Sequence, residues 1–452
     1  MKILQTIAGM SAKSGGPSTC TLDMMNGLYD IHACTDLLTM KCANPEEHNL
    51  GEESPWLHEV ENDCKTPFVI SKNVQRFLKS SDYDLYHSNA LWMGMNHDTC
   101  RIARELGKPY IISPHGMLYP TAMNVHAWKK WILLNLWYNK DIHSACCLHV
   151  TCKQEMEHCR TFGYKGPIAV IPNAVVFPKG IEVKQQSERN NDGKRVIGFL
   201  GRLHPIKKVE RILYALDLLR KEEIGLAQRV SFQIMGKYDD AYEQWLKEEV
   251  KRLGLEESVE FVGFVSGKDK YERLARLSAL MVPSAQENFG MIVPEALICG
   301  TPVYASLGTP WNELNERHCG WWRDNEPATI ANVIKEILSL SNDELLEMGR
   351  NGRKLMEEKY EQHKVASMMK RLYEWIVIDK MEKDKRPEFV YDCCSESGDR
   401  YLNHLYTNKK WNAKQERIQK AESITPTAHL MNSSPTRSIN IFMTETNQGP
   451  VT

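Results

Sequence analysis

The alternation of short apolar runs with longer helical patterns is the feature that most constrains the fold of this chain. Such an alternation is typical of parallel α/β sheets, whose neighbouring strands are joined by helical crossovers. One series of predicted strands comprises Lys2–Ile7, Asp36–Thr39, Leu85–His87, Tyr110–Ser113, His149–Thr151 and Ala169–Ile171. A second series comprises Val196–Leu200, Val230–Met235, Val259–Val262, Leu280–Val282, Pro302–Tyr304 and Gly320–Trp322. Each series predicts one doubly wound, Rossmann-like domain.

The boundaries of these domains follow from changes in composition. Residues 179–194 (KGIEVKQQSERNNDGK) are too polar to bury a core, so we interpret them as a linker between domains at 1–178 and 195–377. A long helical pattern, Asn342–Ile376, ends the second domain. Residues 378–452 become rich in Ser, Thr, Asn and Pro, and we expect an appended tail that is largely disordered. A length of 452 residues agrees with two domains and an addition.

Charge and cysteine content exclude several classes of protein. The 57 basic and 58 acidic side chains give a net charge of -1, which offers no overall field for nucleic acid. The 13 cysteines include no C-x-x-C spacing, and no signal peptide is recognisable, so we expect reduced thiols and a cytoplasmic protein. No uncharged apolar run reaches the roughly 18–20 residues that span a bilayer.

Residues 126–143 (HAWKKWILLNLWYNKDIH) combine tryptophans with lysines. Such a segment is typical of helices that lie on a membrane, where it would meet a lipid-linked acceptor at the inner face of the cytoplasmic membrane. The alternative is an amphipathic helix that packs on its own domain.

Two loops of the first half carry candidate site residues. The Gly15-Gly16 pair follows the first predicted strand, where it either lets the backbone of Gly16 approach a phosphate or sugar or simply forms a tight turn. His115, in Ser-Pro-His-Gly-Met, follows another strand. Because open parallel sheets bind ligands at the carboxyl ends of their strands, this histidine is a candidate for a cleft rather than for the core. No G-x-G-x-x-G follows any strand, which disfavours a dinucleotide-dependent oxidoreductase.

A basic loop follows the first strand of the second half. Arg202 and Lys207 are separated by a Pro-containing turn, so a bidentate guanidinium and a point charge can face one diphosphate. The alternative is a solvated basic loop.

The segment Pro283–Ala296 (PSAQENFGMIVPEA) leaves a strand, turns at Asn-Phe-Gly and enters a helix. The amides around Gly290 are then free to bind phosphate. Glu295 stands on an otherwise apolar helix, which is costly unless the carboxylate has a partner. That partner is either a ribose diol or a lysine. Because no cluster of metal-ligating side chains is apparent, Asp82-Tyr83-Asp84 included, we expect neither a metal nor a cofactor.

These blocks together resemble the retaining glycosyltransferases of family 4, whose GT-B fold places two Rossmann-like domains across a cleft. The resemblance covers about residues 1–377. It is carried by the Gly-Gly loop, S-P-H-G-M-L, V-I-P-N at Val170–Asn173, G-R-L-x-P-x-K, P-S-x-x-E-x-F-G-x-x-x-x-E-A, and G-T-P-W-N-E-L…C-G-W-W at Gly308–Trp322. The last segments are similar to those of bacterial enzymes that build capsular polysaccharide, exopolysaccharide or lipopolysaccharide.

The resemblance implies transfer of a hexose from a nucleotide diphosphate sugar to a glycan or lipid-linked hydroxyl, with retention and without a metal ion. It also implies a role for each motif residue. Expected donor-binding residues are Gly16 in its loop, Arg202 and Lys207 at the diphosphate, Glu295 at the ribose, and Glu287, Phe289 and Gly290 in the sugar-binding loop. His115 is expected at the reaction centre, as the catalytic residue.

Two positions depart from the family pattern, which has glycine where this chain has Lys208 and Gly-Gly where it has Gly308-Thr309. Two other function classes remain open at this point. A sugar-nucleotide epimerase or hydrolase would turn over the donor without an acceptor, and a non-catalytic binder would not turn it over at all.

Overall fold

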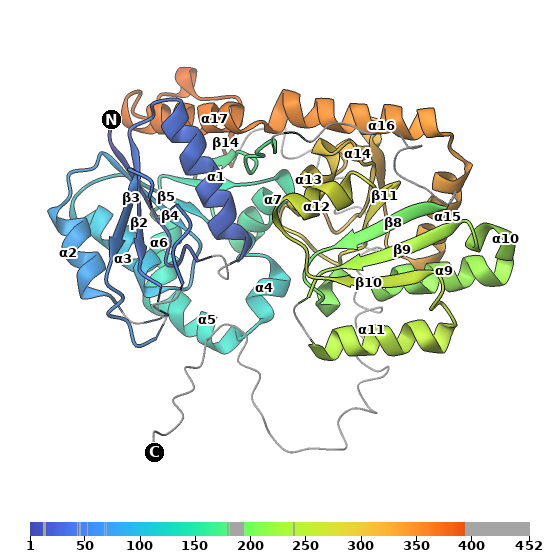
Figure 1. Ribbon diagram of the computed structural model, residues 1–452. Helices are drawn as coiled ribbons and strands as arrows, with labels where there is room; N and C mark the ends of the chain where they lie inside the picture. Colours follow the sequence, from blue (N-terminus) through green and yellow to red (C-terminus); the bar gives the residue numbers. More distant parts are fainter. Residues whose placement is uncertain are drawn as a thin grey trace, which may run out of the picture. The chain divides into compact units, whose positions relative to one another are not determined.

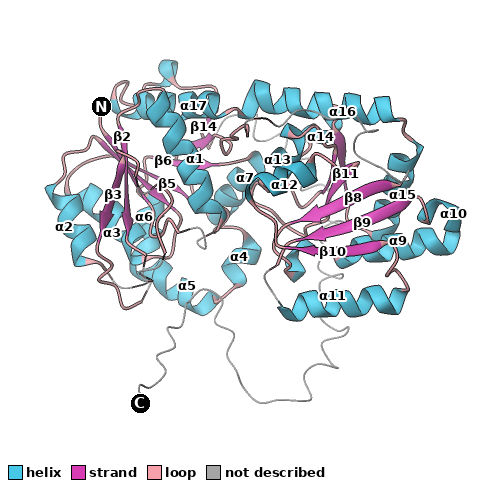
Figure 2. Cartoon of the chain, viewed as in Figure 1, coloured by secondary structure: helices cyan, strands magenta, loops and turns pink. Residues whose placement is uncertain are grey.

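The first half of the chain folds around an eight-stranded sheet (Figures 1 and 2). The structure is a computed structural model that describes residues 1–393, apart from 12–14, 43, 45–46, 52, 67, 69, 179, 181–193 and 238–239. The strand order is β14-β7-β6-β5-β4-β1-β2-β3. The strands are β1 (Ile3–Thr6), β2 (Thr35–Met40), β3 (Leu57–Val60), β4 (Leu85–Asn89), β5 (Tyr110–Ser113), β6 (Cys147–Val150), β7 (Ile168–Val170) and β14 (Val390–Tyr391). All pairs are parallel except β14 with β7.

Helices cover both faces of this sheet (Figure 2). They are α1 (Gly16–Asp30), α2 (Lys72–Ser80), α3 (Gly94–Glu105), α4 (Pro120–Asn124), α5 (Ala127–Leu133), the π-helix η2 (Leu134–Tyr138), α6 (Asn139–His143) and α7 (Lys153–Phe162). Successive residues of one strand enter different cores, since Ile3 packs in one buried cluster and Leu4 in another. Burial on both faces explains why these strands appear in the sequence as apolar runs.

The second half contains a six-stranded, wholly parallel sheet with the order β10-β9-β8-β11-β12-β13. Its strands are β8 (Arg195–Leu200), β9 (Val230–Met235), β10 (Val259–Gly263), β11 (Ala279–Val282), β12 (Val303–Ser306) and β13 (Gly320–Arg323). Its helical segments are η3 (Pro205–Lys207), α9 (Glu210–Glu222), α10 (Ile224–Ala227), α11 (Asp240–Leu253), α12 (Gly267–Leu274), α13 (Ile292–Ile298), α14 (Glu313–Glu316) and α15 (Pro327–Ser339). The prediction of two doubly wound parallel-sheet domains is confirmed.

The long helical pattern near residue 342 forms three helical segments rather than one. They are α16 (Asn342–Leu355), the π-helix η4 (Met356–Tyr360) and α17 (Gln362–Val377). The helical backbone is interrupted at Glu361, whose ψ is 139°. The Glu361 carboxylate accepts hydrogen bonds from the first amides of α17. α17 packs on α1 and joins the core of the first sheet through Leu372 and Trp375 (Figure 1).

Residues that the sequence assigned to the tail also join the first sheet. After η5 (Lys383–Lys385), β14 pairs antiparallel with β7, and Phe389 and Val390 are buried in the core that α17 covers. The apolar run of β14 is too short to be recognised in the sequence among its polar neighbours. The edge strand β3 was also not predicted, because it is only half-buried. Residues 394–452, like most of the predicted linker, lie outside the described residues, so the predicted domain boundaries there stay predictions.

Two further observations concern the cysteines and the length of the helices. The structure joins no two of the described cysteines in a disulfide. Among the described helices, none is both long and apolar enough to cross a membrane.

Candidate functional site

Both sheets reverse their strand order at a single point, which in open α/β sheets is where ligands bind. The reversal lies between β1 and β4 in the first sheet and between β8 and β11 in the second. The loop after β8 carries Arg202 and Lys207, and the loop after β11 carries Glu287. The parallel topology therefore brings the two motifs of the second half to the same edge of the sheet, beside its switch point.

The loops after β8 and β11 are joined by an ion pair. The Lys207 ammonium contacts the Glu287 carboxylate, which also accepts a hydrogen bond of 2.7 Å from the Ser284 hydroxyl. Arg202 is exposed on the same loop as Lys207. Lys208 has a φ of 54°, in the left-handed region that favours glycine, which gives a physical reason for the glycine of the family pattern.

The Glu287 loop is shaped by close backbone contacts. The Glu287 amide donates to the Gly308 carbonyl at 2.9 Å, and a Cβ on Gly308 would lie 2.2 Å from the Ala285 carbonyl oxygen. Only glycine fits at position 308. The second glycine of the family's Gly-Gly pair is replaced in this chain by Thr309. Phe289 is buried edge-on against Trp311 at 5.0 Å, so its side chain supports the loop from within, and Gly290 has a φ of 76°.

Glu295 lies on α13 and has a protein partner. Its carboxylate is 2.9 Å from the Lys270 ammonium, and this pairing is the lysine alternative that the sequence left open. Burial lowers the pKa of Lys270, but the Glu295 carboxylate outweighs it and raises that pKa overall. Asp23 on α1 experiences the same carboxylate, because burial, followed by repulsion from Glu295, raises the pKa of Asp23 to about 6.

His115 follows β5 and has a left-handed backbone with a φ of 50°. Its Nε2 is 3.2 Å from Oδ1 of Asn89, at the end of β4. Burial, and secondarily the neighbouring His149, lowers the pKa of His115 to about 3, so the imidazole is neutral. The next residue is fixed by a buried carboxylate, since the Gly116 amide donates to Glu155 at 2.5 Å.

The two halves meet at the His115 loop. A Cβ on Gly116 would lie 3.1 Å from the Cβ of Asn288, and the Cys152 thiol donates to the Asn288 carbonyl at 3.3 Å. The loop that carries His115 and the loop that carries Glu287 are therefore in contact, as a site shared by the two sheets requires.

Beside His115 is a small cavity built from the first sheet and the helices α1 and α17. It is lined by Gln5, Cys20, Thr21, Met24, His87, Asn89, His115, His149, Asn173 and Met369. Asn89 and Glu155 were not predicted from the sequence. A signal for Asn89 exists, because it ends a strand at the switch point, but Glu155 carries no mark that distinguishes it from a surface carboxylate.

Gly16 begins α1, and Gly15 before it has a φ of 88°. A Cβ on either glycine would meet no atom within 4 Å, so the backbone there borders open space. The rest of this loop, residues 12–14, lies outside the described residues. Within the described part of the chain, no group of three or more His, Cys, Asp or Glu side chains is placed to hold a metal ion.

Two family models match the chain, "Glycosyl transferases group 1" over residues 180–355 and "Glycosyl transferase 4-like domain" over residues 45–174. The mannosylfructose-phosphate synthase of Agrobacterium fabrum is 24% identical over 330 residues, which are 66% of this chain and 72% of that protein. A D-inositol 3-phosphate glycosyltransferase of Stackebrandtia nassauensis is 28% identical over 33% of this chain, and the match spans only 34% of that protein.

The structure of Anabaena HepE in complex with UDP superposes with a TM-score of 0.64 at 17% identity, covering 82% of this chain and 99% of that one. This likeness concerns the fold, which is that of the GT-B glycosyltransferases. Because both halves match glycosyltransferase models and together form that fold, the chain belongs to the glycosyltransferases of the family 4 type.

Proposed function

We propose that this protein transfers a hexose from a nucleotide diphosphate sugar to a hydroxyl of a glycan or lipid-linked acceptor, with retention of configuration and without a metal ion. The observation that carries the proposal is that the His115 loop contacts the Glu287 loop, which in turn is joined to the loop of Arg202 and Lys207 by the Lys207–Glu287 ion pair. The UDP bound in HepE and the transferase names of the relatives support the choice of donor.

The reaction requires stabilisation of a departing diphosphate. Arg202 and Lys207 provide two positive charges in the loop that follows β8. Preorganised charge of this kind is often the largest contribution to catalysis where a leaving group gains negative charge. Lys207 is paired with Glu287 in this structure. A bound diphosphate would pair with the Lys207 ammonium instead, and the Glu287 carboxylate would then accept hydrogen bonds from sugar hydroxyls.

Retention follows if the acceptor hydroxyl attacks the anomeric carbon on the face from which the diphosphate leaves. The carbon–oxygen bond to the diphosphate breaks, its electron pair stays on the phosphate oxygen, and that oxygen takes the proton of the attacking hydroxyl. His115 is neutral, so it would orient a sugar hydroxyl by a hydrogen bond rather than supply charge.

The test is turnover of a panel of nucleotide sugars, with and without simple glycoside acceptors. Arg202→Ala and Lys207→Ala should each weaken binding of UDP or GDP by about 1.5–3 kcal/mol, as expected for charge-assisted hydrogen bonds. Product formed only when an acceptor is present supports transfer. Equal donor turnover without an acceptor would indicate a hydrolase or epimerase, and binding without any turnover would indicate a sugar-nucleotide binder.

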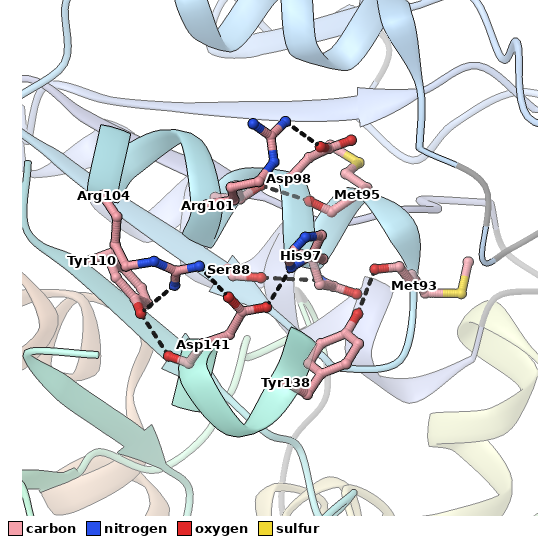
Figure 3. Close-up of polar contacts among 12 residues, drawn as sticks. Ser88, Met93, Met95, His97, Asp98, Arg101, Arg104, Tyr110, Tyr138 and Asp141 are labelled. Carbon is pink, nitrogen blue, oxygen red and sulfur yellow. Dashed lines mark hydrogen bonds and ion pairs between the residues drawn. The ribbon is translucent and has the colours of Figure 1, made fainter. Parts of the chain in front are cut away.

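We further propose that the acceptor belongs to cell-surface polysaccharide synthesis and is met at an anionic membrane. The segment from α5 to α6 is anchored by one side only. Asp141 is buried between His97, at 2.7 Å, and Arg104, at 2.6 Å, while Tyr138 donates to the Met93 carbonyl (Figure 3).

The opposite side of the same segment is apolar and exposed. Trp128 and Trp131, three residues apart and therefore neighbours on the surface of α5, are 65% and 67% exposed, and Leu136 in η2 is 64% exposed. The sequence from Met117 to Lys140 contains lysines but no Asp or Glu, and Lys129 and Lys140 are exposed. Apolar side chains beside cations, in a stretch without carboxylates, suit the surface of a bilayer that contains anionic lipid.

Sedimentation with vesicles tests this surface. The protein should bind phosphatidylglycerol-containing vesicles more tightly than phosphatidylcholine vesicles, and Trp128→Ala with Trp131→Ala should remove most of the binding. Phe264→Ala is the matched control, because Phe264 is a 74% exposed aromatic residue in the second half. Equal binding by all three proteins, or no binding by any, would contradict the proposal.

A further inference from the structure

A continuous network of buried hydrogen bonds leads from the Ile171 carbonyl oxygen, by way of Tyr373 on α17, to His115. It consists of side chains that are each at most 5% exposed before it reaches His115: Gln5, His87, Asn89, Ser113, His149 and Tyr373. Strand β4 contributes two of these residues, and β1, β5, β6 and α17 contribute one each.

The network ends at the carbonyl oxygen of Ile171, which can only accept a hydrogen bond. His149 Nε2 lies 2.9 Å from the carbonyl oxygen of Ile171, so Nε2 must carry the proton. Burial lowers the pKa of His149 to about 4, so the ring is neutral and its Nδ1 is an acceptor. Nδ1 is 2.7 Å from the Ser113 hydroxyl, which therefore donates its single proton to this hydrogen bond.

The order of donors and acceptors continues toward α17. Ser113 Oγ lies 2.6 Å from His87 Nε2, and because the serine proton is already used, His87 must donate from Nε2. Burial, followed by the nearby His149 and His115, lowers the pKa of His87 well below its usual value, so His87 Nδ1 is also an acceptor. Its donor is the Tyr373 hydroxyl at 2.8 Å.

The direction then carries over to the site. The Tyr373 oxygen, its proton used, accepts from the Gln5 amide nitrogen at 3.0 Å. The Gln5 carbonyl oxygen faces the Asn89 amide nitrogen at 2.9 Å, which leaves Asn89 Oδ1 to accept from His115 Nε2 at 3.2 Å. A single assignment of protons satisfies all seven contacts.

We infer that Tyr373 is a positioning residue that, through Gln5 and Asn89, holds His115 as the Nε2–H tautomer with Nδ1 free of a proton. This inference rests on the proposed function only in its consequence, which is that Nδ1 accepts a hydrogen bond from a sugar hydroxyl and that the opposite tautomer does not. The helix α17 is distant from His115 in the sequence, but through Tyr373 it helps to set the protonation of the His115 ring.

Nitrogen-15 spectra of the full-length protein labelled at histidine test the inference without reference to activity. The signals of His87, His115 and His149, assigned with single His→Gln variants, should each be those of a neutral ring protonated on Nε2. A wild-type His115 protonated on Nδ1 would overturn the inference whatever the enzyme does.

The variant Tyr373→Phe removes the hydroxyl that directs the Gln5 and Asn89 amides, so both can reverse and the Nδ1–H tautomer of His115 should appear. The value of kcat should fall by roughly 10- to 100-fold, the range seen when groups that orient metal-bound imidazoles are removed, while nucleotide affinity stays within about twofold. Tyr164→Phe is the matched control, since it removes a buried hydroxyl that donates to the Ala145 carbonyl in the same half of the chain.

An unchanged His115 tautomer in folded Tyr373→Phe would contradict the positioning role. A changed tautomer in a protein that transfers no sugar would contradict the proposed function alone.

Discussion

The Lys270 ammonium lies 2.9 Å from the Glu295 carboxylate. This pairing gives the isolated carboxylate of α13 a partner before any ligand arrives. It does not exhaust the carboxylate, since a carboxylate has about four acceptor sites and one ammonium occupies few of them. Glu295 can therefore be held by Lys270 and still accept from a ribose diol.

We predict that Glu295→Gln weakens binding of UDP or GDP by about 1 kcal/mol, because a charge-assisted hydrogen bond to ribose becomes a neutral one. Isothermal calorimetry measures the loss. Lys270→Met is the matched partner variant, which breaks the ion pair from its other side. If both variants lose only thermal stability and neither loses affinity, the carboxylate is structural.

Asp23→Asn should stabilise the protein at neutral pH. Burial and Glu295 raise the pKa of Asp23 from 3.8 to about 6. A carboxyl group whose folded pKa exceeds its unfolded pKa binds its proton more tightly in the folded state, so its ionisation costs stability as the pH rises from about 4 to 6. A tenfold difference in proton affinity between the two states corresponds to about 1.4 kcal/mol, which predicts a gain of about 2–3 kcal/mol at pH 7.5.

Thermal unfolding of wild type and Asp23→Asn between pH 4 and 8 measures this gain, which should shrink toward zero as the pH falls to about 4. The exposed Asp82, changed to Asn, serves as the control and should have little effect at any pH. A stabilisation that is the same at pH 4 and 7.5 would exclude the titration of Asp23 as its cause.

Donor turnover should survive an excess of EDTA. The reason is that Arg202 and Lys207 place two positive charges at the proposed diphosphate site, which is the task a divalent cation performs in other transferases. Initial rates with and without chelator measure the effect. Loss of activity that Mn²⁺ or Mg²⁺ restores would show that the two side chains are not sufficient.

A chain that ends at Lys385 should be less stable than one that ends at Cys393. The shorter chain lacks Phe389 and Val390, which are 6% and 3% exposed in the core under α17. Loss of one buried phenylalanine side chain typically costs about 3–5 kcal/mol. Denaturant unfolding of the two proteins measures the difference. Equal midpoints would show that β14 contributes nothing to the first sheet.

The sequence alone determined the two sheets and the ends of the strands to which the motifs attach. The strands are buried on both faces, so their apolar runs stand out, and a parallel sheet places all carboxyl ends at one edge. It follows that Arg202, Lys207, Glu287 and His115 could be assigned to strand ends before the structure was known. Two edge strands lack that signal, because β3 is only half-buried along its length and β14 is only two residues long.

Only the tertiary structure decided which side chains meet. Gln5, Asn89 and Tyr373 are separated by hundreds of positions or lie on different elements, and no local pattern relates them. The same holds for Lys270, which closes on Glu295 from another helix. Local periodicity specifies which face of an element is buried, but the partner of a buried polar group depends on the packing of distant elements. The residues named by motifs were therefore accessible from the sequence, and those that hold them in place were not.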